Sequence, residues 1–239
     1  MMQQEKRGLS GSTLKLIAIV TMLIDHVGLG VVGRLMLLKP QLYDVYSIMR
    51  GIGRIAFPIF IFLLVEGMRK TSNVKKYALR LGAFALLSEI PFDLAFHMEI
   101  LEFTYQNVFF TLFIGLLTIW AMDGAARLIE GKWLKVLLMA GILAAGAGLA
   151  ELLRTDYGAK GILCIAVMYI FSFDRRLQLV AGSISFLWER VAPLAFIPLA
   201  FYNGRRGLKL KYVFYVFYPL HLLLIYLLCL GLGLTYSII

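Results

Sequence analysis

Long runs of hydrophobic residues, broken by short polar or basic segments, extend along almost the whole chain. A helix needs about 20 apolar residues to cross a bilayer, and most of the runs approach that length. The pattern therefore predicts an all-α bundle of about nine helices that passes through a membrane several times. The predicted helices fall at 13–37, 47–68, 76–97, 107–127, 133–153, 160–173, 177–188, 191–202 and 211–236.

Two of these runs, 177–188 and 191–202, are too short to cross a bilayer by themselves. Glu189-Arg190 separates them, and Pro193 follows. Both flanks of the pair are basic, so a single span would place a basic cluster on the outer side, against the usual bias. We therefore expect a short helical hairpin that enters and leaves on one side, where protein or a wet cavity covers it.

Basic residues give the direction of the helices, because Lys and Arg concentrate in cytoplasmic loops. The segment at 97–106, HMEILEFTYQ, follows the third run and contains two glutamates and no Lys or Arg. Alternation of the loops predicts a cytoplasmic N-terminus and an external C-terminus. The basic clusters are Arg69, Lys70, Lys75, Lys76 and Arg80; Arg127, Lys132 and Lys135; Arg175 and Arg176; and Arg205, Arg206, Lys209 and Lys211.

The composition agrees with a membrane protein. Hydrophobic residues make up 61% and charged residues 16% of the 239 positions, whereas soluble domains are about 25% charged. The length suits one integral membrane domain over 1–239. We attribute the net charge of +10 to cytoplasmic loops that face anionic lipids, and not to a nucleic-acid partner. The two cysteines lie in apolar runs, so neither a disulfide framework nor a metal site is expected.

The first run carries ionisable residues where a membrane helix rarely has them: Lys15, Asp25 and His26. A charged group at mid-membrane costs about 2.5–3.5 kcal/mol on insertion scales, which favours a functional or pairing role. Lys15 and His26 are eleven positions apart, so both lie on one helix face, roughly 16 Å apart along the axis.

Other predicted helices bring ionisable groups to similar depths, which predicts one polar chamber. Asp25 and His26 point in different directions because they are adjacent in a helix. We therefore expect Asp25 to meet Arg54 or another cation, and Glu89 or Asp93 to hold the His26 imidazole. The alternative is that such residues only pair helices with one another. The candidate catalytic residues are His26, Asp25, Arg54, Glu89, Asp93 and His221.

Several motifs that contain Gly, Pro or charged residues inside apolar runs resemble the TraX family of bacterial inner-membrane proteins, over residues 13–226. That family is associated with acetylation of the N-terminus of conjugative pilin. The chain is also distantly similar to the acyltransferase-3 group, which has an Arg/Lys-x10-His pattern that Lys15 and His26 fit. The motifs are LKLIAIVTMLIDH, RGIGRIAFPIFIFLLVEGMRKTSNVKKYALRL, SEIPFDLAF, QNVFFTL, DYGAKGIL, IPLAFYNGRRG and KYVFYVFYPLHL.

The resemblance implies acetyl transfer from cytoplasmic acetyl-CoA, a co-substrate, to an acceptor at the outer face of the bacterial cytoplasmic membrane. The acceptor is the pilin amine by family association; an envelope glycan or a small peptide would need the same chemistry. His26 would act as general base or carry the acetyl group, and Arg54 would stabilise the oxyanion or position Asp25. The coenzyme A phosphates would bind Lys15, Asn203, Arg205, Arg206 and Lys209.

Two other function classes remain open at this point. A secondary transporter would also use intramembrane Asp, Glu, His and Arg residues and short interrupted helices. Against it, no inverted repeat is visible in the sequence. A scaffold for pilus or envelope assembly is the third possibility, and in that case substitution of His26 would have no effect on function.

Overall fold

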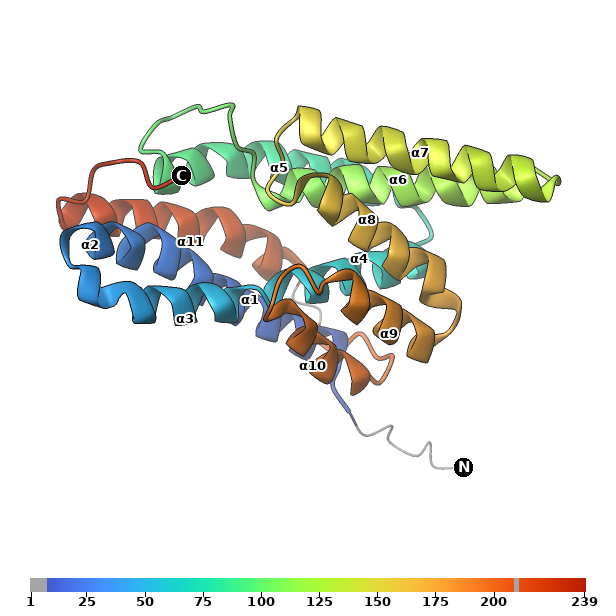
Figure 1. Cartoon of the computed structure of the whole chain (residues 1–239), viewed down its shortest axis with the longest axis horizontal. Helices are drawn as coiled ribbons and strands as arrows, with labels where there is room; N and C mark the ends of the chain where they lie inside the picture. Colours follow the sequence, from blue (N-terminus) through green and yellow to red (C-terminus); the bar gives the residue numbers. More distant parts are fainter. Residues whose placement is uncertain (1–7, 209–210) are drawn as a thin grey trace.

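The structure is a computed structural model that describes residues 8–208 and 211–239. Most of the described residues are helical and none belongs to a strand. The continuous helical stretches group into nine helices, as the hydrophobic runs predict. Figure 1 shows most of them running along the long axis of the molecule. The α-helices are α1 Gly11–Val27, α2 Gly33–Leu38, α3 Tyr43–Gly53, α4 Ala56–Lys70, α5 Val74–Phe96, α6 Val108–Leu128, α7 Lys132–Leu152, α8 Gly158–Ile170, α9 Arg175–Ser185, α10 Phe196–Ala200 and α11 Lys211–Gly231.

Two pairs of these helices are continuous. A π-helical segment, Gly28–Val32, joins α1 to α2, and only two residues separate α3 from α4. Five helical stretches in the described part of the chain are long and apolar enough to cross a membrane, which indicates a membrane protein. They are Gly11–Leu38, Pro40–Lys70, Val108–Leu128, Lys132–Leu152 and Val213–Gly231.

The helix α5 is absent from these five although it is 23 residues long, because charged residues near both of its ends lower its hydropathy. It packs against α6 and α11. Pro91 lies inside α5 without ending it, and the helix continues to Phe96. A proline removes one hydrogen bond from a helix interior, and α5 continues past it while it packs against α6 and α11.

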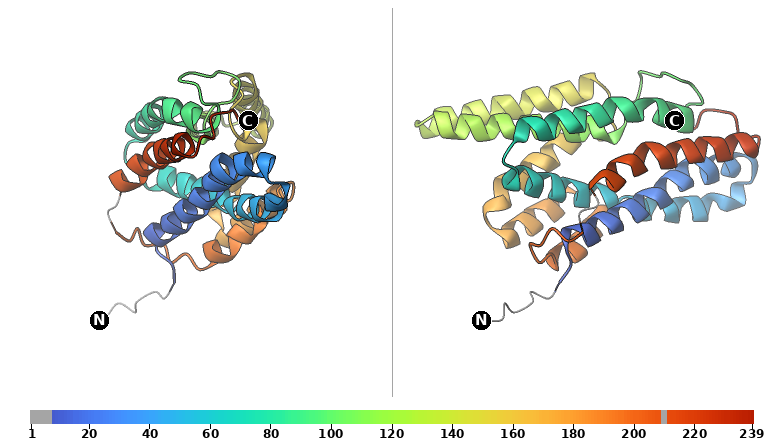
Figure 2. Two further views of the ribbon diagram at one scale, coloured as in Figure 1. Left: turned by 90° about the vertical axis from the view of Figure 1, so that its left-hand side faces the viewer. Right: turned by 180° about the vertical axis from the view of Figure 1, so that it is seen from behind.

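The helix α1 lies in the middle of one half of the bundle, where it packs against α3, α4 and α11. In the other half, α6, α7 and α8 pack on one another, and the turn between α6 and α7 projects beyond the rest (Figures 1 and 2). Most of the buried apolar residues of both halves belong to one cluster, which α4 joins by packing on α1, α6 and α8.

The expected short hairpin is present at α9 and α10. Asp174 caps α9 by accepting hydrogen bonds from the backbone of Arg176 and Leu177, so the helix begins earlier than its apolar run. The hairpin returns to the end of the bundle from which it starts, since Lys70 contacts the ring of Tyr202. This end carries the α4–α5, α6–α7 and α8–α9 turns and the loop 203–208, and we call it the basic end.

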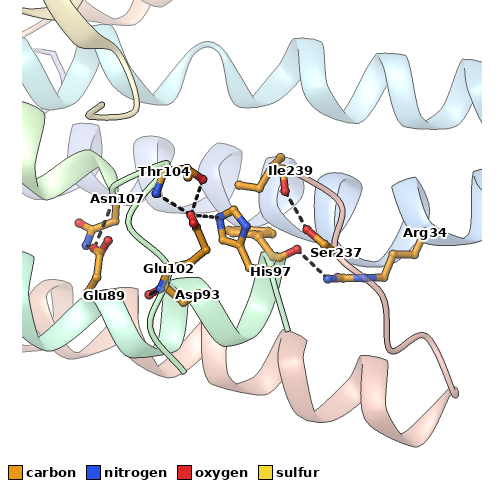
Figure 3. A network of polar contacts seen from close by, with 10 residues as sticks. Arg34, Glu89, Asp93, His97, Glu102, Thr104, Asn107, Ser237 and Ile239 are labelled. Carbon is orange, nitrogen blue, oxygen red and sulfur yellow. Dashed lines mark hydrogen bonds and ion pairs between the residues drawn. The ribbon is translucent and has the colours of Figure 1, made fainter. Parts of the chain in front are cut away.

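The buried cation Arg34 fastens the opposite end of the bundle. Its side chain is 0% exposed and donates hydrogen bonds to the carbonyls of Gly30, Ala95, Phe96 and Tyr236. Two of these carbonyls belong to the last turn of α5, where the helix dipole favours a positive charge. Arg34 therefore joins α2, α5 and the C-terminal segment (Figure 3).

Candidate functional site

Two histidines from different helices form a hydrogen-bonded pair. His26 comes from the last turn of α1 and His221 from the middle of α11. His26 Nδ1 lies 2.7 Å from His221 Nε2, and the two rings are almost parallel, with 7° between their planes. His221 Nδ1 lies 2.8 Å from the backbone carbonyl oxygen of Phe217.

These two contacts determine where the protons lie when both rings are neutral. A carbonyl oxygen only accepts, so His221 Nδ1 carries a hydrogen and His221 Nε2 has the lone pair. His26 Nδ1 must then donate to His221 Nε2. His26 Nε2 is left without a hydrogen, which makes it the basic atom of the pair.

His26 lines a small polar cavity of about 80 Å³ between α1, α3, α4 and the loops that precede α6 and α8. Aromatic and aliphatic side chains form most of the wall, and charged or hydroxyl-bearing side chains from four segments enter it. Besides His26, its polar lining residues are Asp25, Arg50, Arg54, Tyr105, Asp156 and Tyr157.

Asp25 pairs with Arg50 rather than with Arg54. Arg50 Nη1 lies 2.6 Å from Asp25 Oδ2, and both side chains are largely buried. The close approach of α1 and α3 requires Gly53, because a Cβ atom at that position would lie 2.1 Å from the Cβ of Asp25. The expectation that Asp25 meets a cation other than His26 is therefore fulfilled by a residue that the sequence interpretation had not chosen.

Arg54 faces the tip of the α9–α10 hairpin. Its Nε atom lies 3.6 Å from the Oε2 atom of Glu189, in the segment between the two helices of the hairpin. Arg54 also lines the cavity with Tyr157, whose ring stacks on Phe57 with 3.5 Å between centroids. The hairpin thus contributes a charge to the group of residues around His26.

Asp156 and Tyr105 come from two loops that run side by side. Gln106 and Thr155 form a parallel bridge, and the Tyr105 hydroxyl donates to Asp156 Oδ1. Asp156 lies between α7 and α8, outside the candidate spans. Burial raises the pKa of the Asp156 carboxyl, and the hydrogen bond from Tyr105 opposes that rise.

Glu89 and Asp93 lie elsewhere, so the expectation that one of them holds the His26 imidazole is wrong. Both residues are buried on the face of α5 that meets the loop 97–107 (Figure 3). The Asn107 side chain donates to Glu89 Oε2, and the backbone N–H of Glu102 donates to Asp93 Oδ2 at 2.9 Å. The two carboxyl groups therefore fasten this loop, and His221 takes the place expected for them.

His97 also belongs to this network rather than to the cavity. It is 7% exposed, and its Nε2 atom lies 3.9 Å from Glu102 Oε2. Figure 3 shows the ring between Glu102 and Ile239.

Four of the five residues expected to bind coenzyme A lie at the basic end, and Lys209 lies outside the described residues. The backbone of Gly11 and Ser12 donates to the carbonyls of Arg205 and Arg206, so the loop 203–208 packs on the start of α1. The Asn203 side chain donates to the carbonyl of Gly8, and Lys15 lies over the ring of Phe214. The rise of α1 places Lys15 roughly 16 Å from His26.

A larger cavity of about 650 Å³ lies away from His26, near the C-terminal ends of α4, α6 and α8. Arg69, Arg127 and Tyr169 are among its lining residues. Asp123 accepts hydrogen bonds or ion pairs from two of these, Tyr169 and Arg127. The lining of this larger cavity includes none of the candidate residues predicted from the sequence.

The sequence interpretation missed four polar residues of the small cavity: Arg50, Tyr105, Asp156 and Tyr157. Arg50 precedes Arg54 by four residues, and this spacing could have indicated a shared face. Asp156 and Tyr157 begin the motif DYGAKGIL, which supported the family resemblance but not the choice of site residues. Tyr105 has no such signal, because only the pairing of two loops brings it to Asp156.

Comparison with known proteins gives two matches. A family model described as TraX protein matches residues 10–229. The probable fimbrial assembly protein FimC, serogroup H1, from Dichelobacter nodosus is 29% identical, over 90% of this chain and 94% of that protein. No solved structure matches the chain with statistical significance. Because the family model covers most of its length, the chain belongs to the TraX family.

Proposed function

We propose that this protein is a membrane-embedded acetyltransferase that moves an acetyl group from acetyl-CoA to an acceptor amine or hydroxyl. The observation that carries the proposal is the His26–His221 pair, whose basic Nε2 atom belongs to a residue lining a polar cavity. Membership in the TraX family supports a pilin-related acceptor, as does the fimbrial assembly named for the relative.

The proposed chemistry uses the residues around the cavity in separate roles. The acceptor nitrogen or oxygen attacks the thioester carbonyl and loses a proton to His26 Nε2 as the new bond forms. The bond between carbon and sulfur then breaks, and His26 returns the proton to the departing thiolate. Arg54 lines the same cavity and would stabilise the negative charge that develops on the carbonyl oxygen.

The arrangement of charge supports entry of the two substrates from opposite ends. Lys15 and the loop 203–208 lie at the basic end, where Lys and Arg would bind the phosphates of coenzyme A. The opposite end carries the loop 97–107, with Glu99 and Glu102. We place the basic end in the cytoplasm of a multi-pass protein of the bacterial inner membrane, in accord with the positive-inside bias.

The proposal is tested by acetyl transfer with purified protein in nanodiscs. Labelled acetyl-CoA is supplied with an amine acceptor, and the variant His26→Gln is compared with His97→Gln, a buried histidine outside the cavity. We expect His26→Gln to slow transfer by about 10²-fold or more, and His97→Gln to retain most of the activity. Full activity of a folded His26→Gln variant would overturn the proposal.

A secondary transporter is the second candidate, and one observation favours it. The described helices include a break between α3 and α4 and a short hairpin, features that carriers use to line a substrate site. Uptake of labelled solutes into proteoliposomes without acetyl-CoA would support the transporter, whereas consumption of acetyl-CoA would support the enzyme.

A further inference from the structure

The charges around the small cavity are not equally engaged. Asp25 is paired with Arg50, and Arg54 with Glu189. The carboxyl group of Asp156 forms no ion pair among the described residues. Asp156 is therefore the acidic group of the cavity that remains available to a cation.

The backbone holds Asp156 in a defined position. Its N–H donates to the carbonyl of Gln106 at 2.9 Å, and the N–H of Gln106 donates to the carbonyl of Arg154 at 3.0 Å. The Tyr105 hydroxyl donates to Oδ1. The second oxygen, Oδ2, accepts no hydrogen bond from the described residues, which leaves it for a ligand in the cavity.

Resting on the proposed acetyl transfer, we propose that Asp156, positioned by Tyr105, binds the ammonium form of an amine acceptor beside His26 and selects amines over hydroxyl compounds. An ammonium group offers three N–H donors, and a carboxylate accepts them with a charge-assisted bond. A neutral hydroxyl group gains less from the same contact. Apolar walls, including Phe92 and Phe96, reduce screening of this attraction by water.

The proton balance of the reaction is consistent with this arrangement. The bound ammonium must lose one proton to become a nucleophile, and His26 Nε2 accepts it and passes it to solvent. The nitrogen then attacks the thioester carbonyl and loses a second proton, which reaches the departing thiolate through His26. One nitrogen–carbon bond forms, one carbon–sulfur bond breaks, and one proton is released in total.

The surface charge outside the cavity supports the approach of a cation from the end opposite Lys15. Residues 97–106 contain Glu99 and Glu102 and no Lys or Arg. Acidic residues raise the local concentration of cationic ligands around them. The same loop contributes Tyr105 to the cavity, so it connects the acidic surface to Asp156.

The test compares hexylamine with hexan-1-ol as acceptors, because the two probes differ only in the reacting group. Asp156→Asn keeps an oxygen that can accept from Tyr105 but removes the charge. We expect this variant to raise KM for hexylamine about ten- to hundredfold. The KM for acetyl-CoA and the rate with hexan-1-ol should stay close to those of the parent. Asp44 is an exposed residue at the start of α3, and Asp44→Asn is the matched control. It should leave both KM values and the rate with hexan-1-ol unchanged.

Two further variants separate a positioning role from a structural one. Asp156→Glu retains the charge and should recover part of the affinity for hexylamine. Tyr105→Phe retains the carboxylate but removes the hydrogen bond that orients it. This variant should therefore raise KM for hexylamine less than Asp156→Asn does. Unchanged KM for hexylamine in a folded Asp156→Asn variant would overturn the assignment, as would equal losses with hexylamine and hexan-1-ol.

Binding of hexylamine without acetyl-CoA distinguishes failure of this inference from failure of the proposed function. One outcome is that the parent protein binds hexylamine but transfers no acetyl group, while Asp156→Asn binds hexylamine at least tenfold more weakly. In that case the role of Asp156 in amine binding is supported and the acetyltransferase proposal fails. If the parent is active and Asp156→Asn binds hexylamine as well as the parent does, only the role of Asp156 in amine binding is overturned.

Discussion

At the scale of single residues, the backbone carbonyl of Phe217 determines, through the ring of His221, which nitrogen of His26 is basic. It requires a hydrogen on His221 Nδ1, and His221 Nε2 in turn requires one on His26 Nδ1. Burial of His221, which is 3% exposed, removes water as an alternative partner. His221 therefore acts as a positioning residue for His26 in the proposed reaction.

Replacing His221 with Phe should test this role. The ring shape is largely kept, but His26 Nδ1 loses its acceptor, and His26 is free to adopt the other tautomer. We expect kcat for acetyl transfer to fall about 10²-fold or more, with little change in KM for acetyl-CoA. His97→Phe is the matched control, because it makes the same exchange at a buried histidine that does not line the cavity. Loss of activity in the control variant of the same size would count against the tautomer explanation.

The acid limb of the pH profile should depend on Asp156. Burial raises the pKa of the Asp156 carboxyl, and the proposed binding of an ammonium group requires the charged carboxylate. Activity with hexylamine should therefore fall as pH falls through this raised pKa, above the range of an ordinary aspartate. The groups that act on Asp156 are Tyr105, Arg50, Arg54 and Glu189. The limb should be absent in Asp156→Asn, and an identical limb in that variant would assign it to another group.

Helical spacing predicted which residues share a face but not which neighbour they meet. The sequence placed Asp25, His26, Arg54, Glu89, Asp93 and His221 in one polar group, and all of them except Glu89 and Asp93 meet around the cavity or beside it. The partners were harder to predict, because they depend on the rotation of each helix against the next. Asp25 meets Arg50 for this reason, although Arg54 lies only one turn further along.

At the scale of helices, close packing of α1 on α3 depends on Gly53. Gly53→Ala places a methyl group against Asp25, since the nearest Asp25 atoms would lie 2.1–2.4 Å from the added Cβ. We expect a loss of about 1–3 kcal/mol in stability, measured as a lower Tm in detergent. Gly141→Ala in α7 is the control, because its Cβ would meet no atom within 4 Å. A Tm for Gly53→Ala equal to that of the control would contradict this packing.

The hydrophobic pattern was sufficient to predict the number of helices and the α9–α10 hairpin. It predicted the residues at which the helices begin and end less well. The run at 47–68 begins several residues after the helical stretch that contains it, which starts at Pro40. Polar residues such as Tyr43 and Asp44 continue that helix outside the apolar run. Arg34 was not chosen from the sequence, because its partners are carbonyl groups that no residue pattern reveals.

At the scale of the whole molecule, the uneven distribution of charge predicts the orientation in the membrane. Glu99 lies in the loop 97–107 and Glu130 in the turn between α6 and α7; both are exposed and lie at opposite ends. In intact cells, Glu99→Cys should react with a membrane-impermeant maleimide, and Glu130→Cys should react only after lysis. Background should be low because Cys164 and Cys229 are buried. The reverse labelling pattern would invert the proposed topology.

Transfer across a sealed membrane tests the central claim most directly. Oriented proteoliposomes receive labelled acetyl-CoA only on the side of the basic end and an amine acceptor only on the side of the loop 97–107. The proposed function predicts labelled acetyl-amine on the acceptor side with the parent protein and with His97→Gln, and almost none with His26→Gln. Equal product with His26→Gln, or product only when both substrates share one side, would contradict it.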